Sequence, residues 1–174
     1  DANTIATPVN LGIVHKDSTP TSALVINNKA PVSAYTEGLN ATKSTVTPPT
    51  GDALVSGANI DNLAGGSSSS TILVGLSTAT VGAKTGTVTI DLASNGANSG
   101  LANTGLTSQV ITVNGSVYSG KSTWIGGDPN YWGTLSSGFG VNWGADQGSP
   151  GLDPAFTGVD TATFGSTSGS VTVN

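Results

Sequence analysis

The stretch Gln109–Tyr118 reads Q-V-I-T-V-N-G-S-V-Y and is the clearest strand signal in the sequence. Its residues 110–113 are all β-branched, and such side chains fit the pleated surface of a strand. Six further runs rich in apolar and β-branched residues are bounded by Gly, Pro, Asn or Ser, which favours short strands joined by turns. These runs are Val9–Ile13, Ala23–Ile26, Val32–Val46 with a break at Gly38, Ala53–Val55, Thr71–Leu76 and Gly86–Leu92.

The pattern of the chain predicts an all-β fold. About seven short strands within some 118 residues match the size and turn spacing of an immunoglobulin-like antiparallel sandwich. Residues 1–118 hold only two aromatic residues, Tyr35 and Tyr118, whereas the rest of the chain is rich in aromatics and glycine. We therefore predict a sandwich domain at 1–118 and a Trp-rich β-appendage at 119–174.

Composition narrows the function. The 174 residues carry a net charge of −5, only 9% are charged, and there are five lysines and no arginine. Nucleic-acid partners need a basic surface, so they are not expected, and neither is an anionic membrane surface. The sequence contains no run of about 18 apolar residues, so no membrane-spanning helix is predicted. A neutral surface rich in Ser, Thr, Gly and Asn is typical of extracellular bacterial β-proteins, so we expect a secreted or cell-surface location.

Catalytic and metal chemistry have few candidate residues. There is no cysteine and one histidine, His15, so thiolate catalysis and clustered His/Cys zinc sites are not expected. A Ser-His-Asp arrangement would have to use His15, and no G-x-S-x-G turn is present. We predict that the protein is not an enzyme and needs no cofactor or metal.

Several stretches resemble a known family. The sequence T-S-A-L-V-I-N-N-K-A-P-V-S-A-Y-T-E-G-L-N-A-T-K-S at 21–44 is similar to the sandwich repeats of bacterial surface proteins of the choice-of-anchor D type. Three more stretches agree in order and spacing, at 63–76, 82–96 and 106–118. The resemblance implies a secreted or surface-anchored module, often in tandem, without enzymatic activity.

The last third resembles a second family. The stretches S-T-W-I-G-G-D-P-N-Y-W at 122–132, N-W-G at 142–144, D-T-A-T-F-G at 160–165 and S-V-T-V-N at 170–174 are similar to the opening segment of autotransporter-associated β-strand repeats. In that family a tryptophan-bearing cap leads into a parallel β-helix. The sequence stops after the first strand of any such helix, so no β-helical domain is expected within it.

The single glutamate, Glu37, lies beside Gly38 in Y-T-E-G-L-N. Its expected role is to fix this turn by accepting backbone N–H bonds. An alternative is an acid that assists a Lys-to-Asn isopeptide crosslink.

Four aspartates of the glycine-rich segment could offer oxygen ligands to calcium. No EF-hand spacing is present, so we expect these aspartates to occupy turns. They are Asp128, Asp146, Asp153 and Asp160.

The aromatic residues of the appendage admit three interpretations. They can stack on sugar rings as a flat platform, or they can pack together as the core of the appendage, where each hides about 150 to 250 Å². The third interpretation is an interface with another surface. The side chains concerned are Trp124, Tyr131, Trp132 and Trp143, with Phe139 beside them.

The two ends of the sequence are candidates for assembly. Ser170–Asn174 carries the alternation of Val171 and Val173 without a protecting charge, and an unpaired strand readily pairs with another chain. Asp1–Pro8 is extended before the alternation of Val9, Leu11 and Ile13. Either end can complete the sheet of a neighbouring copy, or both can fold back on their own subunit.

The sequence therefore favours a structural function. We expect a non-enzymatic extracellular protein that forms filaments head to tail, because a terminal strand of one copy adds to a sheet edge of the next. The first alternative is a carbohydrate-binding or adhesive module, with extracellular polysaccharide as its partner. The second is a passive spacer in a larger surface protein.

Overall fold

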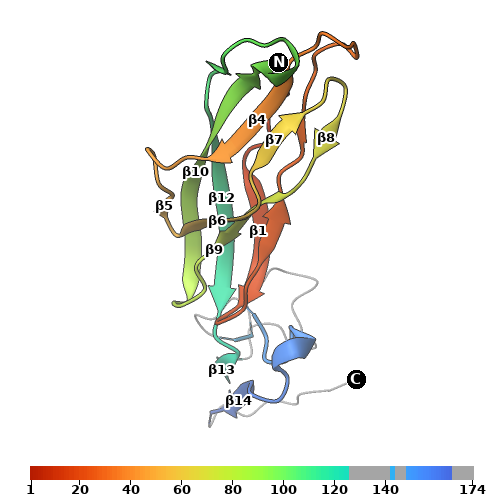
Figure 1. Ribbon diagram of the computed structural model, residues 1–174. Helices are drawn as coiled ribbons and strands as arrows, with labels where there is room; N and C mark the ends of the chain where they lie inside the picture. Colours follow the sequence, from red (N-terminus) through yellow and green to blue (C-terminus); the bar gives the residue numbers. More distant parts are fainter. Residues whose placement is uncertain (126–141, 144–147, 166–174) are drawn as a thin grey trace. The chain divides into compact units, whose positions relative to one another are not determined.

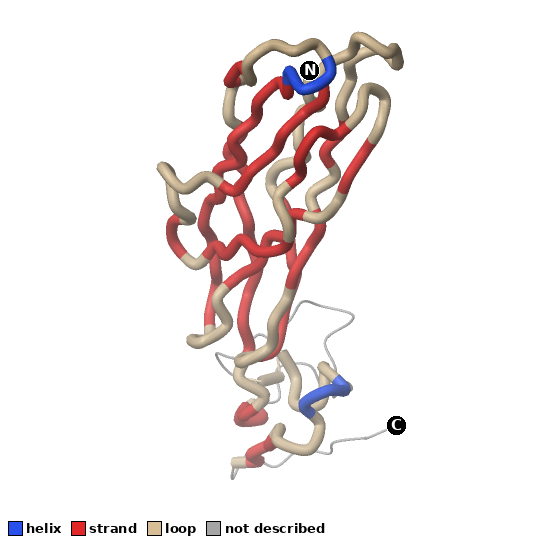
Figure 2. Tube along the Cα trace, viewed as in Figure 1, coloured by secondary structure: helices blue, strands red, loops and turns tan. Residues whose placement is uncertain are grey.

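The computed structural model describes residues 1–125, 142–143 and 148–165, and within these it is built of strands (Figures 1 and 2). Helical structure there is confined to the short 3-10 turns η1 (Gly96–Asn98) and η2 (Pro154–Phe156). The strands are β1 (Val9–His15), β2 (Thr21–Ala23), β3 (Ile26–Asn27), β4 (Gly38–Lys43), β5 (Thr50–Gly51), β6 (Ala53–Gly57), β7 (Ile60–Leu63), β8 (Ser68–Ser69), β9 (Ile72–Leu76), β10 (Gly82–Asn95), β11 (Thr104–Gly105), β12 (Gln109–Tyr118), β13 (Lys121–Trp124) and β14 (Thr161–Phe164).

The strands form two main sheets. The larger sheet has the order β1-β12-β10-β4-β7, with β5 and β11 pairing along β10. The smaller sheet has the order β2-β9-β6, and β3 pairs with β8 beside it. The pairings of β10 with β4, of β4 with β7 and of β9 with β2 and β6 are all antiparallel. The described strands are thus those of a predominantly antiparallel sandwich.

One pairing of the larger sheet is parallel. Along the β1 side of β12, Ile5 N–H donates to the side chain of Gln109, Thr112 N–H donates to Thr7, and Lys16 N–H donates to the carbonyl of Tyr118. Residue numbers increase in the same direction on both sides of these bonds, so the N-terminal stretch and β1 run parallel to β12. Strand β1 is the end strand of this sheet.

The core lies between the inner faces of the two sheets. Ile90 and Ile111 of the larger sheet and Val74 of the smaller one are fully buried. Strand β12 shows the period of two that a half-buried strand requires, since Ile111 and Val113 point inward and Val110 is exposed. The predicted fold class, an all-β immunoglobulin-like sandwich, is confirmed.

By internal contacts the chain divides into two compact units. The first comprises Asp1–Leu11, Pro20–Leu76 and Thr85–Asn114 and contains the sandwich core. The second comprises Gly12–Thr19, Ser77–Lys84 and Gly115–Asn174. In the second unit β13 and β14 pair in parallel, with Ser122 beside Ala162 and Trp124 beside Phe164. The domain boundary that composition predicts, near residue 119, stays a prediction.

Several predicted strands differ from those observed. The run Val32–Val46 contains a strand only at Gly38–Lys43, and its first part is a loop. The run Ala23–Ile26 is divided between β2 and β3. Strand β10 is longer than Gly86–Leu92, and at its end residues 93–95 continue the pairing with β4. Ser68 and Ser69 lie outside the predicted strand runs, yet they form β8, which pairs with β3.

Candidate functional site

The N-terminal edge of the sandwich is the first candidate site. Val9, Leu11 and Ile13 of β1 are all half-buried, and the first two pack against the core of the sandwich. Between residues 9 and 14 the strand carries no charged residue and no proline. Charged side chains and prolines are the usual means by which natural proteins protect an edge strand from pairing with another chain. Apart from Gly12, whose positive φ of 71° interrupts a regular strand, β1 lacks such protection.

The segment Asp1–Thr7 before β1 is bound to its own sandwich, which corresponds to the folded-back alternative for this end. Ala2 forms an antiparallel bridge with Asn28, and the backbone of Asn3 donates to the carbonyl of Asn27 over 3.2 Å. The backbone N–H of Lys29 donates to the Asp1 carbonyl over 2.7 Å. Ile5 is only 3% exposed and belongs to the core cluster. The segment is therefore bound as an additional strand with one buried anchor.

Two side-chain amides replace backbone groups along this segment. The Gln109 amide accepts a hydrogen bond from Ile5 N–H over 2.7 Å and donates one to the Asn3 carbonyl over 2.8 Å. The Asn3 amide accepts from Asn27 N–H over 2.8 Å and donates to the Val25 carbonyl over 3.2 Å. Each amide thus offers one donor and one acceptor to a strand, as a peptide group does. The sequence reasoning missed both residues, because nothing in their spacing marks them.

The other end of the sequence lies outside the described residues. Val171 and Val173 were predicted to form an assembly strand, and both belong to the range 166–174 that the structure does not describe. The strand-donation prediction for Ser170–Asn174 therefore stays a prediction.

The aromatic residues of the appendage form a second candidate site. Trp124 is 8% exposed and Trp143 is 1% exposed. Their rings lie 5.1 Å apart at 76°, and each lies 6.4 Å from the ring of Phe164. Buried indole rings offer no face to a sugar, so the positions of these two tryptophans correspond to the packing interpretation. Tyr131, Trp132 and Phe139 lie outside the described residues.

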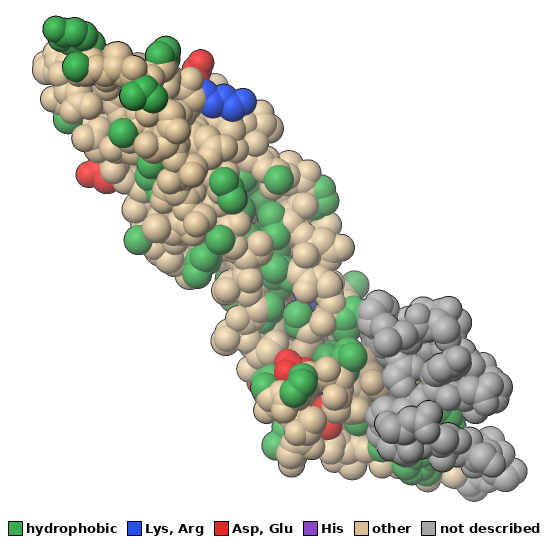
Figure 3. Space-filling model, turned by 90° about the vertical axis from the view of Figure 1, so that its right-hand side faces the viewer, with side chains coloured by type: hydrophobic (Ala, Val, Ile, Leu, Met, Phe, Trp, Pro, Cys, Tyr) green, Lys and Arg blue, Asp and Glu red, His purple; other side chains and the backbone are tan. Residues whose placement is uncertain are grey.

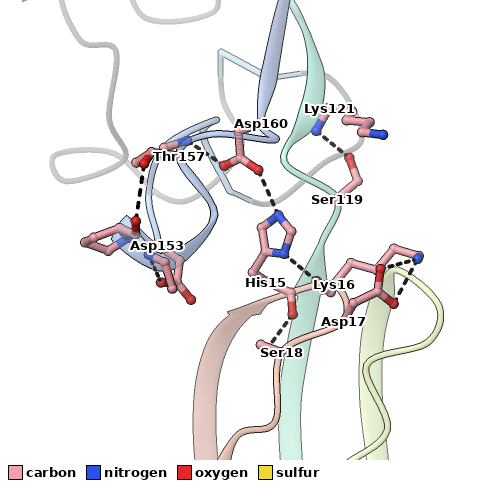
Figure 4. Close-up of polar contacts among 12 residues, drawn as sticks. His15, Lys16, Asp17, Ser18, Ser119, Lys121, Asp153, Thr157 and Asp160 are labelled. Carbon is pink, nitrogen blue, oxygen red and sulfur yellow. Dashed lines mark hydrogen bonds and ion pairs between the residues drawn. The ribbon is translucent and has the colours of Figure 1, made fainter.

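His15 and Asp160 form a buried pair in the second unit, which the sequence reasoning did not predict. The His15 Nε2 atom lies 2.8 Å from the Asp160 Oδ1 atom, and the two side chains are 6% and 3% exposed. Figure 4 shows the ring between Asp160 and the backbone of Lys16, whose carbonyl contacts Nδ1. The Asp160 Oδ2 atom accepts from Gly151 N–H over 2.7 Å.

The ring of His15 is enclosed by aromatic side chains. Phe156 stacks on it at 3.9 Å between ring centroids and 12° between planes, and Tyr118 meets it edge-on at 5.1 Å. Because both ring nitrogens face oxygen acceptors, neither holds the serine hydroxyl that a Ser-His-Asp arrangement requires. The pair therefore joins the end of β1 to the segment 151–160.

Glu37 binds partners other than those expected. Its carboxylate accepts hydrogen bonds from the hydroxyls of Ser94 and Ser99, the second over 3.1 Å, rather than from backbone N–H groups of its own turn. Asn98 also donates to the Thr36 carbonyl over 3.3 Å. Glu37 thus connects its turn to the loop around η1, far away in the sequence.

The described residues contain no group of three or more side chains suited to a metal ion. Of the four aspartates considered for calcium, Asp153 caps η2 by accepting from Ala155 N–H, and Asp160 pairs with His15. Asp128 and Asp146 lie outside the described residues. Within the described part of the chain, no helix is both long and apolar enough to cross a membrane.

Comparison with known proteins gives a likeness of fold only. No family model matches the chain, and no curated protein matches it. Among solved structures, it is similar to the ASH / PapD-like domain of human CEP192 (PapD-like domain 7), with a TM-score of 0.44 and 9% sequence identity. The alignment covers 68% of this chain and 84% of that domain.

Proposed function

We propose that this protein is a non-catalytic structural module that forms extracellular filaments, in which copies join head to tail by β-strand addition. The observation that carries this proposal is the uncharged strand β1 at the end of the larger sheet, preceded by a segment bound as an extra strand. Edge strands of this kind pair readily with another chain. A head-to-tail contact that does not close into a ring generates a filament.

The surface chemistry supports an extracellular structural role. On the face shown in Figure 3, charged side chains are sparse among uncharged polar and hydrophobic ones. The chain as a whole has five basic and ten acidic residues among 174. Copies of such a protein repel one another only weakly, so short-range strand pairing meets little electrostatic opposition. The resemblance of residues 21–118 to surface-protein repeats supports the same location.

A lysine at position 11 is expected to abolish assembly. Leu11 is half-buried on β1. A charge that points toward the core weakens the packing of this edge strand, both on its own sandwich and on that of a neighbouring copy. The long lysine stem can still lie along the surface, so the sandwich itself is expected to remain folded. We expect Leu11→Lys to lose the fraction of protein that sediments as polymer, while its far-UV circular dichroism stays that of the unmodified chain.

The matched control is Thr45→Lys, which adds the same charge in an exposed loop between β4 and β5. It is expected to assemble like the unmodified chain. Equal assembly by both lysine variants would contradict a role for β1, and a sedimenting fraction absent even from the unmodified chain would contradict the filament.

A further inference from the structure

The contacts of the N-terminal segment define a strand-binding groove, and we propose that a second copy of this chain fills it in the assembly. The donated element is Asp1–Leu11, and the acceptor is the groove between β3 and β12 of the next copy. The inference rests on the proposed function, because it identifies which strand is added and where.

The groove recognises its occupant through three features. The Ile5 side chain is buried in the sandwich core, the Gln109 amide pairs with the backbone of residues 3 and 5, and the backbone of residues 25–29 pairs with the segment from the other side. Pairing of main-chain groups combined with a pocket for one side chain is the recognition mode of strand addition. The preferred occupant is therefore an extended segment with the pattern Asn-x-Ile.

The occupant seen in the structure is the chain's own segment, so an identical segment from a second copy makes the same contacts. Exchange of identical elements between copies needs no new interface and is a low-cost route to assembly. Apart from Ile5, the side chains of residues 1–7 are exposed or half-buried. When the segment transfers, the buried Ile5 side chain leaves the core together with the half-buried Val9 and Leu11, which pack against it.

The donated segment ends just before Gly12, which can act as a hinge. It continues into β1, which lies at the end of the sheet, so its departure leaves the inner strands paired. Gly12 follows directly after Leu11 and has a φ of 71°, and a Cβ at this position would meet no atom within 4 Å. A glycine in this open position permits the change of direction that a donated strand requires.

Disulfide trapping tests the exchange directly, because the chain has no cysteine. The Thr7 hydroxyl accepts from Thr112 N–H over 2.9 Å, so the pair Thr7→Cys and Thr112→Cys places two thiols across the groove. When the two single variants are mixed, assembled and oxidised, we expect a covalent heterodimer on a non-reducing gel. Replacing Thr7→Cys by Thr45→Cys in the mixture is expected to eliminate the heterodimer.

Peptide competition provides a second measurement that needs no disulfide. A synthetic peptide of residues 1–8, D-A-N-T-I-A-T-P, added in excess to the unmodified chain is expected to suppress the sedimenting polymer. The same peptide with Ile5→Asp lacks the buried anchor and is expected to leave assembly unchanged.

The outcomes separate this inference from the proposed function. Heterodimer formation with specific inhibition by the peptide supports the exchange, and it does so even if electron microscopy shows closed dimers, which would contradict the filament. If polymer forms without a heterodimer and without inhibition by the peptide, the exchange is overturned. The proposed function then stands only with strand addition at another part of the sandwich. A chain that forms neither polymer nor heterodimer, at any concentration tested, contradicts both.

Discussion

Replacing Gly120 with alanine is expected to lower the free energy of unfolding of the second unit by about 2–5 kcal/mol. Two costs add. Gly120 has a φ of 70°, where an L-residue is disfavoured by about 1–2 kcal/mol. An added Cβ would also lie 2.0 Å from the Asp160 Oδ1 atom and 2.6 Å from the His15 Nε2 atom, so the buried pair must separate. Overpacking alone typically costs about 1–3 kcal/mol.

Gly151 supplies the matched control for this prediction. It lies in the same unit with a φ of 79°, and a Cβ there would meet no atom within 4 Å. Gly151→Ala is therefore expected to show the backbone cost alone, about 1–2 kcal/mol. Urea unfolding, with hydrogen exchange of peptides covering residues 115–125, measures both variants. Equal effects of the two substitutions would show that the His15–Asp160 pair is not held tightly at Gly120.

Replacing Trp143 with alanine is expected to be the other large effect, at about 3–5 kcal/mol, because the side chain is fully buried against Trp124 and Phe164. We expect hydrogen-exchange protection to fall around β13 and β14. Protection in the sandwich core around Val88–Leu92 is the internal reference within each sample. If Trp143 instead served as an exposed sugar platform, truncation would leave protection unchanged.

Phe164→Ala is the matched control within the same aromatic cluster. Phe164 is 52% exposed, so its truncation removes less buried area and is expected to cost about 1–2 kcal/mol. A larger loss for Phe164→Ala than for Trp143→Ala would contradict the assignment of Trp143 as the centre of the cluster.

Local patterns predict much of the sandwich. The β-branched run at residues 110–113 and the alternation of Val9, Leu11 and Ile13 are found in β12 and β1. Patterns failed where pairing rather than propensity decides the structure. Ser68 and Ser69 lack the apolar and β-branched residues of the predicted strands, yet they form a strand because Ile26 and Asn27 offer a partner. The apolar residue Val32 reads as part of a strand, yet it is exposed in a loop.

The sites were less predictable than the fold. The alternation of Val9, Leu11 and Ile13 predicted a half-buried strand. The contacts of Ile5 and Asn3 with Gln109 could not be predicted, because they join residues more than a hundred positions apart in the sequence. His15 and Asp160 are separated by 145 positions, and neither has a local motif. Composition is compared between consecutive stretches of the sequence, whereas the second unit combines three separate ranges. Composition therefore could not show that Gly12–Thr19 and Ser77–Lys84 belong to the same unit as the aromatic segment.

Negative-stain electron microscopy of the unmodified chain, at high concentration and without denaturant, tests the central claim most directly. Strand addition between copies predicts unbranched filaments with a regular subunit repeat, and it predicts that Leu11→Lys yields only dispersed particles. Dispersed particles from the unmodified chain, at every concentration examined, would contradict head-to-tail assembly.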